Sequence, residues 1–228
     1  MKLTGKVILV TGGSRGIGAE VAKMAGKEGA KVVVNFARNK KKAEEVAREV
    51  ESCGGEAMVF GADIRDRTQV ARMILATKDR FGGLDILINN AGVAFWKTFD
   101  QISVDEEEMT IDVNLRGVLI VTREALRLML PQKDGVIVNI ASGAGKVGHP
   151  GLSVYSAAKA GVIGFTQAAG QELDDSGVRM YVVCPGMVAT DMTGNQGMRV
   201  EIMAKKILMA AKEEANLESG GELSVLGD

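Results

Sequence analysis

The 228-residue sequence predicts an α/β fold: a doubly wound parallel sheet of about seven strands with helices on both faces. Two observations lead to this prediction. Short β-branched apolar segments alternate with longer segments of helical periodicity, as in a sheet built from right-handed crossovers. The strand-like segments are also apolar at successive positions, which suits strands that helices cover on both sides. The apolar share of 46% and the charged share of 25% are those of an ordinary globular domain.

The strands are expected where continuous runs of Val, Ile and Leu occur, because a parallel strand is buried on both faces. The first of these runs, Lys6–Thr11, begins close to the start of the chain. The full set of expected strands covers residues 6–11, 31–35, 57–60, 84–89, 136–140 and 180–184, with a short closing strand at 222–225.

Helices are expected between these strands, where apolar residues recur with helical spacing. They cover residues 16–29, 40–52, 68–81, 104–130, 155–176 and 200–215. Gly29, Gly54, Gly82 and Gly177 stand at the ends of four of them, as glycine often does just past a helix. The sequence contains no linker or repeat, so residues 1–228 are expected to form a single domain.

The composition disfavours several classes of protein. A formal net charge of −1 gives no general attraction to nucleic acid or to an anionic membrane. With His149 as the single histidine, neither a zinc centre nor a Ser-His-Asp relay is favoured, and no metal site is expected. Cys53 and Cys184 are expected to be reduced thiols. We find no secretory leader and no apolar run of roughly 18 residues. A cytoplasmic protein without nucleic-acid or membrane partners is therefore expected.

A glycine-rich turn joins the first expected strand to the first expected helix. Glycines at positions 12, 16 and 18 allow the backbone to turn tightly and to approach a pyrophosphate closely. The helix that follows offers backbone N–H groups and a partial positive charge to the anion. The residues expected to bind a dinucleotide here are Gly12, Ser14, Arg15, Gly16, Ile17 and Gly18. A tight turn that binds no ligand is the alternative.

The residues after the second expected strand bear on the choice of dinucleotide. NAD enzymes usually place a carboxylate there for the adenosine ribose, whereas this chain reads Asn35-Phe-Ala37-Arg38. Arg15 and Arg38 can instead converge on a 2′-phosphate, which the planar guanidinium binds in a bidentate manner. NADP(H) is therefore favoured over NAD(H), with Asn35, Ala37 and Arg38 as further cofactor-binding residues. The alternative for Arg38 is an ordinary surface arginine.

The strongest chemical signal is Tyr155 followed four residues later by Lys159, because residues at this spacing share one helical face. An ammonium beside a phenol lowers the phenol pKa from its ordinary value of about 10, which makes Tyr155 a usable acid and base. Ser142 follows the strand at 136–140, at the carboxyl end of the sheet, where open α/β folds bind ligands. Its hydroxyl can donate to a substrate oxygen. An exposed helical pair is the alternative for Tyr155 and Lys159 alone.

Taken in order, these motifs resemble the short-chain dehydrogenase/reductase family. The matching features are the Gly-x-x-x-Gly-x-Gly turn, Asn89-Asn90-Ala91-Gly92, Asn114, Ser142, Tyr155-x-x-x-Lys159 and Pro185-Gly186. The resemblance implies a Rossmann fold and a catalytic set of Asn114, Ser142, Tyr155 and Lys159. It implies further cofactor contacts from Asp63, Ile64, Asn90, Ala91, Gly92, Tyr155, Lys159, Pro185, Gly186, Val188 and Thr190. Asp63 would meet the adenine amino group, and a helix cap is its alternative role.

The resemblance implies an NADP(H)-dependent oxidoreductase that interconverts a ketone and a secondary alcohol. Tyr155 would supply the proton, and Lys159 would hold the nicotinamide ribose and relay a replacement proton. The family branch it most resembles is that of the 3-oxoacyl-[acyl-carrier-protein] reductases. The alternatives are a small-carbonyl, sugar or other alcohol dehydrogenase of the same family, or an NADP-binding sensor without chemistry. A sugar-nucleotide epimerase would be expected to have a larger C-terminal domain.

Two departures from the carrier-protein reductases leave the substrate open, as a small molecule or an acyl thioester. The stretch Gln171–Asp175 is acidic, which would repel an acidic carrier protein. The span after Met192 is also short, so the segments that usually cover the substrate look trimmed. Phe95, Trp96, Met187, Met192 and His149 are candidate walls of the substrate site, or simply packing residues. The family resemblance further implies a homo-oligomer, a homotetramer or a dimer, formed through helices 104–130 and 155–176.

Overall fold

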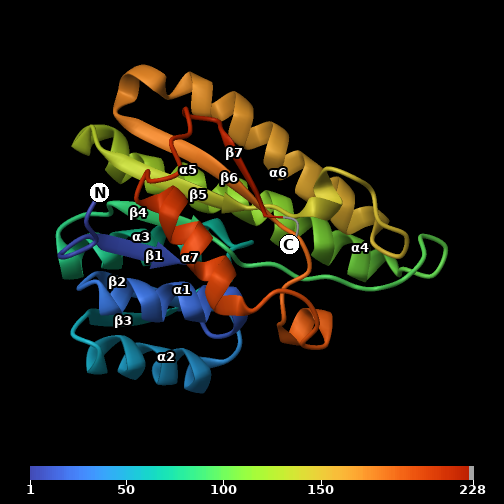
Figure 1. Cartoon of the computed structure of the whole chain (residues 1–228), viewed down its shortest axis with the longest axis horizontal. Helices are drawn as coiled ribbons and strands as arrows, with labels where there is room; N and C mark the ends of the chain where they lie inside the picture. Colours follow the sequence, from blue (N-terminus) through green and yellow to red (C-terminus); the bar gives the residue numbers. More distant parts are fainter. Residues whose placement is uncertain (226–228) are drawn as a thin grey trace.

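The computed structural model describes residues 1–225 and has the expected doubly wound α/β fold (Figure 1). Within these residues, seven parallel strands form one sheet in the order β3-β2-β1-β4-β5-β6-β7. The strands are β1 (Val7–Val10), β2 (Lys31–Phe36), β3 (Glu56–Gly61), β4 (Ile86–Asn89), β5 (Gly135–Ile140), β6 (Val178–Pro185) and β7 (Glu222–Val225). The closing strand is thus confirmed, while residues 226–228 of the expected domain lie outside the described residues.

The helices cover both faces of the sheet, because successive strand residues point to opposite sides. They are α1 (Gly16–Lys27), α2 (Lys40–Ser52), α3 (Arg67–Phe81), α4 (Val104–Ile111), α5 (Gly117–Gln132), α6 (Ser153–Glu172) and α7 (Val200–Ala211). Ile8 and Val10 of β1 belong to a core cluster shared with α1, α2 and α7. Val7 and Leu9 belong to the cluster on the other face, with α3, α5 and α6. The described helices include none that is both long and apolar enough to cross a bilayer.

The order of the strands places a crevice beside β1. From β1 the chain moves outward through β2 to β3, and it then returns to the other side of β1 with β4. At this switch point the loops after β1 and β4 leave in opposite directions, which opens a ligand crevice at the carboxyl ends of the strands. The glycine turn and the Asn89–Gly92 segment are these two loops.

A buried polar ladder ties the two central strands to the helices beneath them. Asn89 of β4 donates to Thr122 of α5 at 2.9 Å and to Asn139 of β5 at 2.8 Å. Asn139 in turn donates to Thr166 of α6 at 2.9 Å. All four side chains are buried, so each hydrogen bond avoids the cost of an unpaired polar group in the core. The ladder fixes α6 relative to the crevice.

The structure differs from the prediction in the segment expected to be one helix over residues 104–130. A five-residue π-helical segment, Asp112–Arg116, separates α4 from α5. Its widened turn lets the side chain of Asn114 donate to the carbonyl of Thr110 at 2.9 Å. Such π segments are mostly single-turn bulges inside helices, and they are frequent at functional sites. α4 itself begins with a capping box formed by Ser103 and Glu106, which explains the sharp start of this region.

Candidate active site

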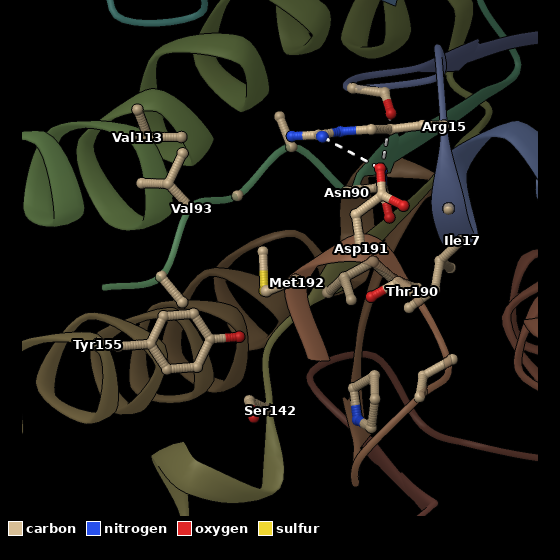
Figure 2. Close-up of a pocket in the computed structure, with 18 of the residues that line it drawn as sticks. Arg15, Ile17, Asn90, Val93, Val113, Ser142, Tyr155, Thr190, Asp191 and Met192 are labelled. Atoms are coloured by element: carbon tan, nitrogen blue, oxygen red, sulfur yellow. Dashed lines mark hydrogen bonds and ion pairs between the residues drawn. The ribbon is translucent and has the colours of Figure 1, made fainter. Parts of the chain in front are cut away.

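A cavity of about 760 Å³ follows the carboxyl ends of the central strands. Figure 2 shows the glycine turn with Arg15 and Ile17 on one side of it, and Ser142 with the hydroxyl of Tyr155 on the other. The predicted site residues that line it are Gly12, Ser14, Arg15, Gly16, Ile17, Asn35, Ala37, Arg38, Asp63, Ile64, Asn90, Ala91, Gly92, Ser142, Tyr155, Lys159, Pro185, Gly186, Val188 and Thr190. The fold therefore brings residues that are up to 178 positions apart, from Gly12 to Thr190, to one cavity.

The glycine turn requires glycine for two physical reasons. Gly12 and Gly16 have φ angles of +63° and +56°, in the left-handed region that side chains disfavour. A Cβ atom on Gly12 would lie 2.9 Å from the Cα of Ala91, and one on Gly18 would lie 2.4 Å from the Asn90 amide nitrogen. Gly18 therefore lies behind the cavity wall and acts through packing. Because Gly12 and Gly18 lack side chains, the turn packs directly against the loop after β4.

The loop after β4 is hydrogen-bonded directly to this turn. The hydroxyl of Thr11 accepts from the backbone N–H groups of Asn90 at 3.0 Å and Ala91 at 3.1 Å. The side chain of Asn90 donates to the carbonyls of Thr11 at 3.0 Å and Gly12 at 3.3 Å. The two sides of the crevice are thus held at a fixed separation before any ligand arrives.

Asn35, predicted as a cofactor-binding residue, has a bracing role in the structure. Its buried side chain accepts from the N–H of Gly12 at 3.3 Å and donates to the carbonyl of Ala62 at 3.0 Å. Ala37 and Arg38, which follow β2, are exposed at the rim of the cavity, together with Lys42. Among the described residues that line the cavity, those directly after β2 are Ala37, Arg38 and Asn39, and none of the three carries a carboxylate, as the sequence indicated.

Asp63 lies at the far end of the cavity, paired with Arg65. The guanidinium of Arg65 contacts the Asp63 carboxylate at 2.6 Å. This hydrogen bond holds the pKa of Asp63 below its ordinary value, despite the opposing effect of burial. The cap of α3 is Asp66, whose side chain accepts from Thr68 and Gln69, so the cap that was the alternative role for Asp63 belongs to Asp66.

Arg15 and Arg38 both line the cavity, but Arg15 has a partner of its own. Its guanidinium lies 3.2 Å from the carboxylate of Asp191, and both side chains are largely exposed. The ion pair bridges the glycine turn and the loop after β6 across the mouth of the cavity (Figure 2). A phosphate that attracts Arg15 therefore competes with Asp191.

The three predicted proton-transfer residues converge at the other end. Ser142 follows β5, and its hydroxyl oxygen accepts from the N–H of Ala144 at 3.2 Å. Lys159 is buried, donates to the carbonyl of Ile140 at 2.7 Å, and has its ammonium 5.7 Å from the ring centroid of Tyr155. Ser142 thus comes from the loop after β5, whereas Tyr155 and Lys159 come from α6.

The electrostatics of this trio differ from the expectation for Tyr155. Burial raises the pKa of the Tyr155 phenol, and interaction with Ser142 only partly opposes the shift. Burial also lowers the pKa of Lys159 to about 8. The sequence predicted that the ammonium would lower the phenol pKa. In the structure the ammonium is engaged by the Ile140 carbonyl, and desolvation dominates both groups.

Asn114, in the π segment, lies behind the cavity wall at the level of Lys159. Its side chain accepts from the N–H of Val93 at 3.2 Å and donates to the carbonyl of Val93 at 2.8 Å. A Cβ atom on Gly92 would lie 2.8 Å from the Asn114 oxygen and 3.8 Å from the Lys159 nitrogen. Asn114 therefore holds the loop that separates it from the lysine.

Comparisons with known proteins agree with this geometry. The family model of the short chain dehydrogenases matches residues 6–200. The chain belongs to the short-chain dehydrogenase family. The 3-oxoacyl-[acyl-carrier-protein] reductase of Synechocystis is 45% identical over 193 residues, which cover 85% of this chain and 78% of that protein. The corresponding reductase of Staphylococcus aureus is 42% identical over the same share of each chain.

Two solved short-chain dehydrogenases show the same fold. One from Burkholderia cenocepacia, determined in complex with NADP, has 31% identity and a TM-score of 0.91, covering 100% of this chain and 98% of its own. One from Mycobacterium marinum has 28% identity and a TM-score of 0.93, covering 99% and 96%.

Several residues of this short-chain dehydrogenase site were not identified from the sequence. Val93, Met109 and Val113 line the cavity, and Arg65 links Asp63 to the sulfur of Met109 at 3.3 Å. Val93, Val113 and Arg65 each flank a residue that was identified, so adjacency to Gly92, Asn114 and Ile64 was the available signal. Met109 carries no local signal, because tertiary packing brings it to Arg65, 44 positions away.

The candidate substrate walls are only partly as expected. Trp96, His149, Met187 and Met192 line the cavity, whereas Phe95 lies outside its described lining. The rings of Trp96 and His149 meet edge to face at a centroid distance of 5.6 Å. Lys97 donates its backbone N–H to the carbonyl of Gly151 at 3.0 Å, which joins the loops that carry the two rings.

Proposed function

We propose that this short-chain dehydrogenase is an NADP(H)-dependent oxidoreductase that interconverts a ketone and a secondary alcohol. The observation that carries the proposal is that Ser142, Tyr155 and Lys159 face the same cavity as the glycine turn. A phenol and a hydroxyl at one end of a dinucleotide-sized cavity suit carbonyl chemistry, because both can donate to a carbonyl oxygen.

The residues present fit a dinucleotide. Of the positive-φ glycines in the turn, Gly12 precedes α1 and Gly16 begins it, so the backbone N–H groups of its first turn suit a pyrophosphate. Arg38 and Lys42 at the rim, with Arg15 nearby, supply positive charge where a 2′-phosphate would bind. The solved relative from Burkholderia cenocepacia in complex with NADP supports the same choice. We assign Asp63 and Ile64 to the adenine end, and Pro185, Gly186, Val188 and Thr190 to the nicotinamide end.

Pro185, Gly186, Val188 and Thr190 would hold the nicotinamide end of the dinucleotide, which would supply a hydride to the carbonyl carbon. Ser142 donates a hydrogen bond from its hydroxyl to the carbonyl oxygen and keeps its proton, while its own oxygen accepts from the N–H of Ala144. Tyr155 gives its phenolic proton to the same oxygen as negative charge develops there. The raised pKa keeps Tyr155 protonated at neutral pH, as an acid must be. Lys159, with a pKa of about 8, is positioned to return a proton to the phenolate.

The substrate end of the cavity favours an apolar ketone. Its described lining beyond Tyr155 includes Ala94, Trp96, Leu152, Met187 and Met192. This composition and the two named relatives support a 3-oxoacyl thioester as the substrate class. The exposed acidic residues Glu172, Asp174 and Asp175 at the end of α6 would repel an acidic carrier protein, so the proposal names the thioester and not its carrier.

We further propose that residues 1–228 form one dinucleotide-binding domain, that the protein is a homo-oligomer and that it is cytoplasmic.

The catalytic half of the proposal is tested with Tyr155→Phe. This variant is expected to lose at least about a hundredfold in turnover, the scale of general acid catalysis, while NADPH binding persists. The assay follows NADPH oxidation over a panel of ketones and 3-oxoacyl thioesters, with NADPH fluorescence to measure binding. Tight NADPH binding by the wild type without turnover of any compound would favour a sensor, and turnover by the variant would remove Tyr155 from the mechanism.

The cofactor half is tested with Arg38→Asp. The substitution places a carboxylate where a 2′-phosphate would bind, so the Kd for NADPH should rise much more than the Kd for NADH. Both constants are measured by fluorescence titration. An equal loss for the two dinucleotides would show that Arg38 does not recognise the phosphate.

A further inference from the structure

The loop that carries Ser142 lies directly against the backbone of the catalytic helix. Ser142 is followed by a 3-10 turn, Gly143–Gly145, in which the N–H of Gly145 donates to the Ser142 carbonyl at 3.0 Å. A Cβ atom on Gly145 would lie 2.7 Å from the carbonyl carbon of Lys159 and 2.8 Å from the nitrogen of Ala160. The distance between the Ser142 loop and α6 is therefore set by backbone contact.

The other side of this loop is fastened to the closing strand. The ammonium of Lys146 donates to the carboxylate of Glu222 at 2.6 Å and to the hydroxyl of Ser224 at 2.9 Å. Ser224 also donates to Glu222. Lys146 and Glu222 are 37% and 20% exposed, so water screens the pair only in part. We call these three residues, Lys146, Glu222 and Ser224, the β7 clamp.

The β7 clamp acts on the same turn that orients the Ser142 hydroxyl. The N–H of Lys146 donates to the Gly143 carbonyl at 3.0 Å, and the N–H of Ala144 donates to the Ser142 hydroxyl oxygen at 3.2 Å. Lys146 therefore belongs, through its backbone, to the same hydrogen-bonded turn whose N–H groups orient the Ser142 hydroxyl. β7 is itself anchored, since Glu222 and Ser224 pair with Val182 and Cys184 of β6.

We propose that the β7 clamp holds the Ser142 loop against α6, and that Lys146 and Glu222 are positioning residues for the reaction. This inference rests on the proposed function, because it assigns the clamp a role in keeping Ser142 aligned with Tyr155. None of the three clamp residues is part of the described cavity lining. Its loss leaves the fold and the dinucleotide site in place and misaligns one hydroxyl.

The experiment compares Lys146→Met, Glu222→Gln, the double variant and Lys146→Arg. Lys146→Met and Glu222→Gln are each expected to lower kcat about three- to thirtyfold, since small displacements of reacting groups reduce the rate strongly. The KM for NADPH and the Tm should stay close to wild type, and Lys146→Arg should recover most of the kcat. The double variant should be no worse than Lys146→Met, because that single variant already loses the contacts of the ammonium with both Glu222 and Ser224.

A matched pair elsewhere serves as control. Lys23 and Glu49 form a 2.7 Å ion pair between α1 and α2, with side chains 26% and 54% exposed. Lys23→Met and Glu49→Gln should leave kcat unchanged. Unchanged kcat in the clamp variants, additive losses in the double variant, or losses that only follow Tm and NADPH affinity would each overturn the proposal.

Hydrogen exchange gives a readout that does not depend on turnover. The N–H groups of Gly145, Lys146 and Val147 are bonded within the turn, so a peptide over residues 141–148 should exchange faster in Glu222→Gln than in wild type or Glu49→Gln. Unchanged exchange would overturn the proposal. A wild-type chain without turnover on any carbonyl would count against the proposed function instead, and the exchange comparison would still decide whether the clamp holds the loop.

Discussion

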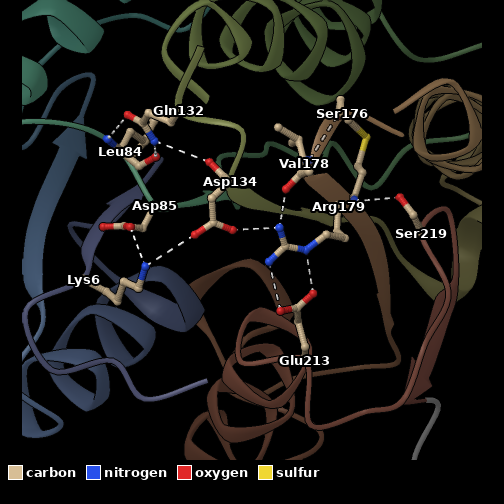
Figure 3. A network of polar contacts seen from close by, with 12 residues as sticks. Lys6, Leu84, Asp85, Gln132, Asp134, Ser176, Val178, Arg179, Glu213 and Ser219 are labelled. Carbon is tan, nitrogen blue, oxygen red and sulfur yellow. Dashed lines mark hydrogen bonds and ion pairs between the residues drawn. The ribbon is translucent and has the colours of Figure 1, made fainter. Parts of the chain in front are cut away.

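A charged network at the amino-terminal ends of the strands is the best place to test how this fold is held together. Arg179, the second residue of β6, donates to Glu213 at 2.8 and 3.0 Å and to Asp134 at 2.8 Å (Figure 3). Lys6 extends the network to Asp85 at 2.7 Å. Arg179 thus joins the segment after α7 to the segment before β5, which are far apart in sequence.

The stability that Arg179 contributes can be estimated from its exposure and its partners. A hydrogen bond to a charged group is worth about 1.5–3 kcal/mol, and exposed ion pairs much less. Arg179 is 27% exposed and Glu213 32%, whereas Asp134 is 51% exposed and adds little. We therefore expect Arg179→Met to lower the free energy of unfolding by about 2–3 kcal/mol, or the Tm by about 5–10 °C.

The stabilisation by Arg179 should decrease as the pH falls. Arg179 holds the pKa of Glu213 and of Asp134 below their ordinary values. Carboxylates with lowered folded pKa contribute stability above their unfolded pKa of about 4, and this contribution is lost as pH falls through the folded value. The difference in the free energy of unfolding between wild type and Arg179→Met should therefore be largest at pH 7 and should become smaller below about pH 4.

The measurement is urea unfolding of both chains at pH 7 and at the lowest pH where both remain folded. Arg199→Met is the control, because Arg199 is 77% exposed and its Glu201 contact is 3.4 Å long. NADPH affinity should not change in Arg179→Met, since the cavity lies at the opposite ends of the strands. The reasoning would be refuted if Arg179→Met lowered the free energy of unfolding by less than about 0.5 kcal/mol at pH 7. It would also be refuted if the difference in the free energy of unfolding between the two chains grew on acidification.

Two further predictions concern the cavity. Asp191→Asn should tighten NADPH binding about two- to fivefold at low salt, because it releases Arg15 from an exposed ion pair. Fluorescence titration should show no change in the Kd for NADH, which lacks the 2′-phosphate, and equal tightening of both dinucleotides would contradict the competition. The rate of ketone reduction should decline as pH rises through about 8, since Lys159 then loses the proton it is proposed to relay. A stopped-flow pH profile that stays flat well above pH 9 would exclude that role.

The alternation of strands and helices could be predicted from the sequence because it depends on local pattern. The strands begin and end within a few residues of their predicted bounds, and α6 begins at Ser153 instead of Tyr155. The π segment Asp112–Arg116 could not be predicted. Its residues are compatible with an ordinary helix, and its widening accompanies the contacts of Asn114 with the Val93 loop. Such contacts join residues 21 positions apart in the chain.

The site shows the same division between local and tertiary information. The glycine spacing and Tyr155-x-x-x-Lys159 each lie within one turn or helix, so the sequence displays them directly. The partner of Arg15 is 176 positions away, at Asp191, and no local pattern indicates it. The raised pKa of Tyr155 likewise depends on how deeply α6 is buried, which spacing alone does not report.

The polar side chains among the predicted site residues fall into two groups: some are hydrogen-bonded to the protein backbone, and others face the cavity. Asn35, Asn90 and Asn114 all donate to backbone carbonyls at the carboxyl ends of the sheet. These amides are occupied by the protein, so they fix the cavity walls and cannot also bind a ligand with the same protons. Ser142 and Tyr155 instead direct hydroxyl groups toward the cavity (Figure 2). Substituting the asparagines should therefore change cofactor affinity and stability together, whereas substituting the hydroxyls should change turnover with little effect on stability.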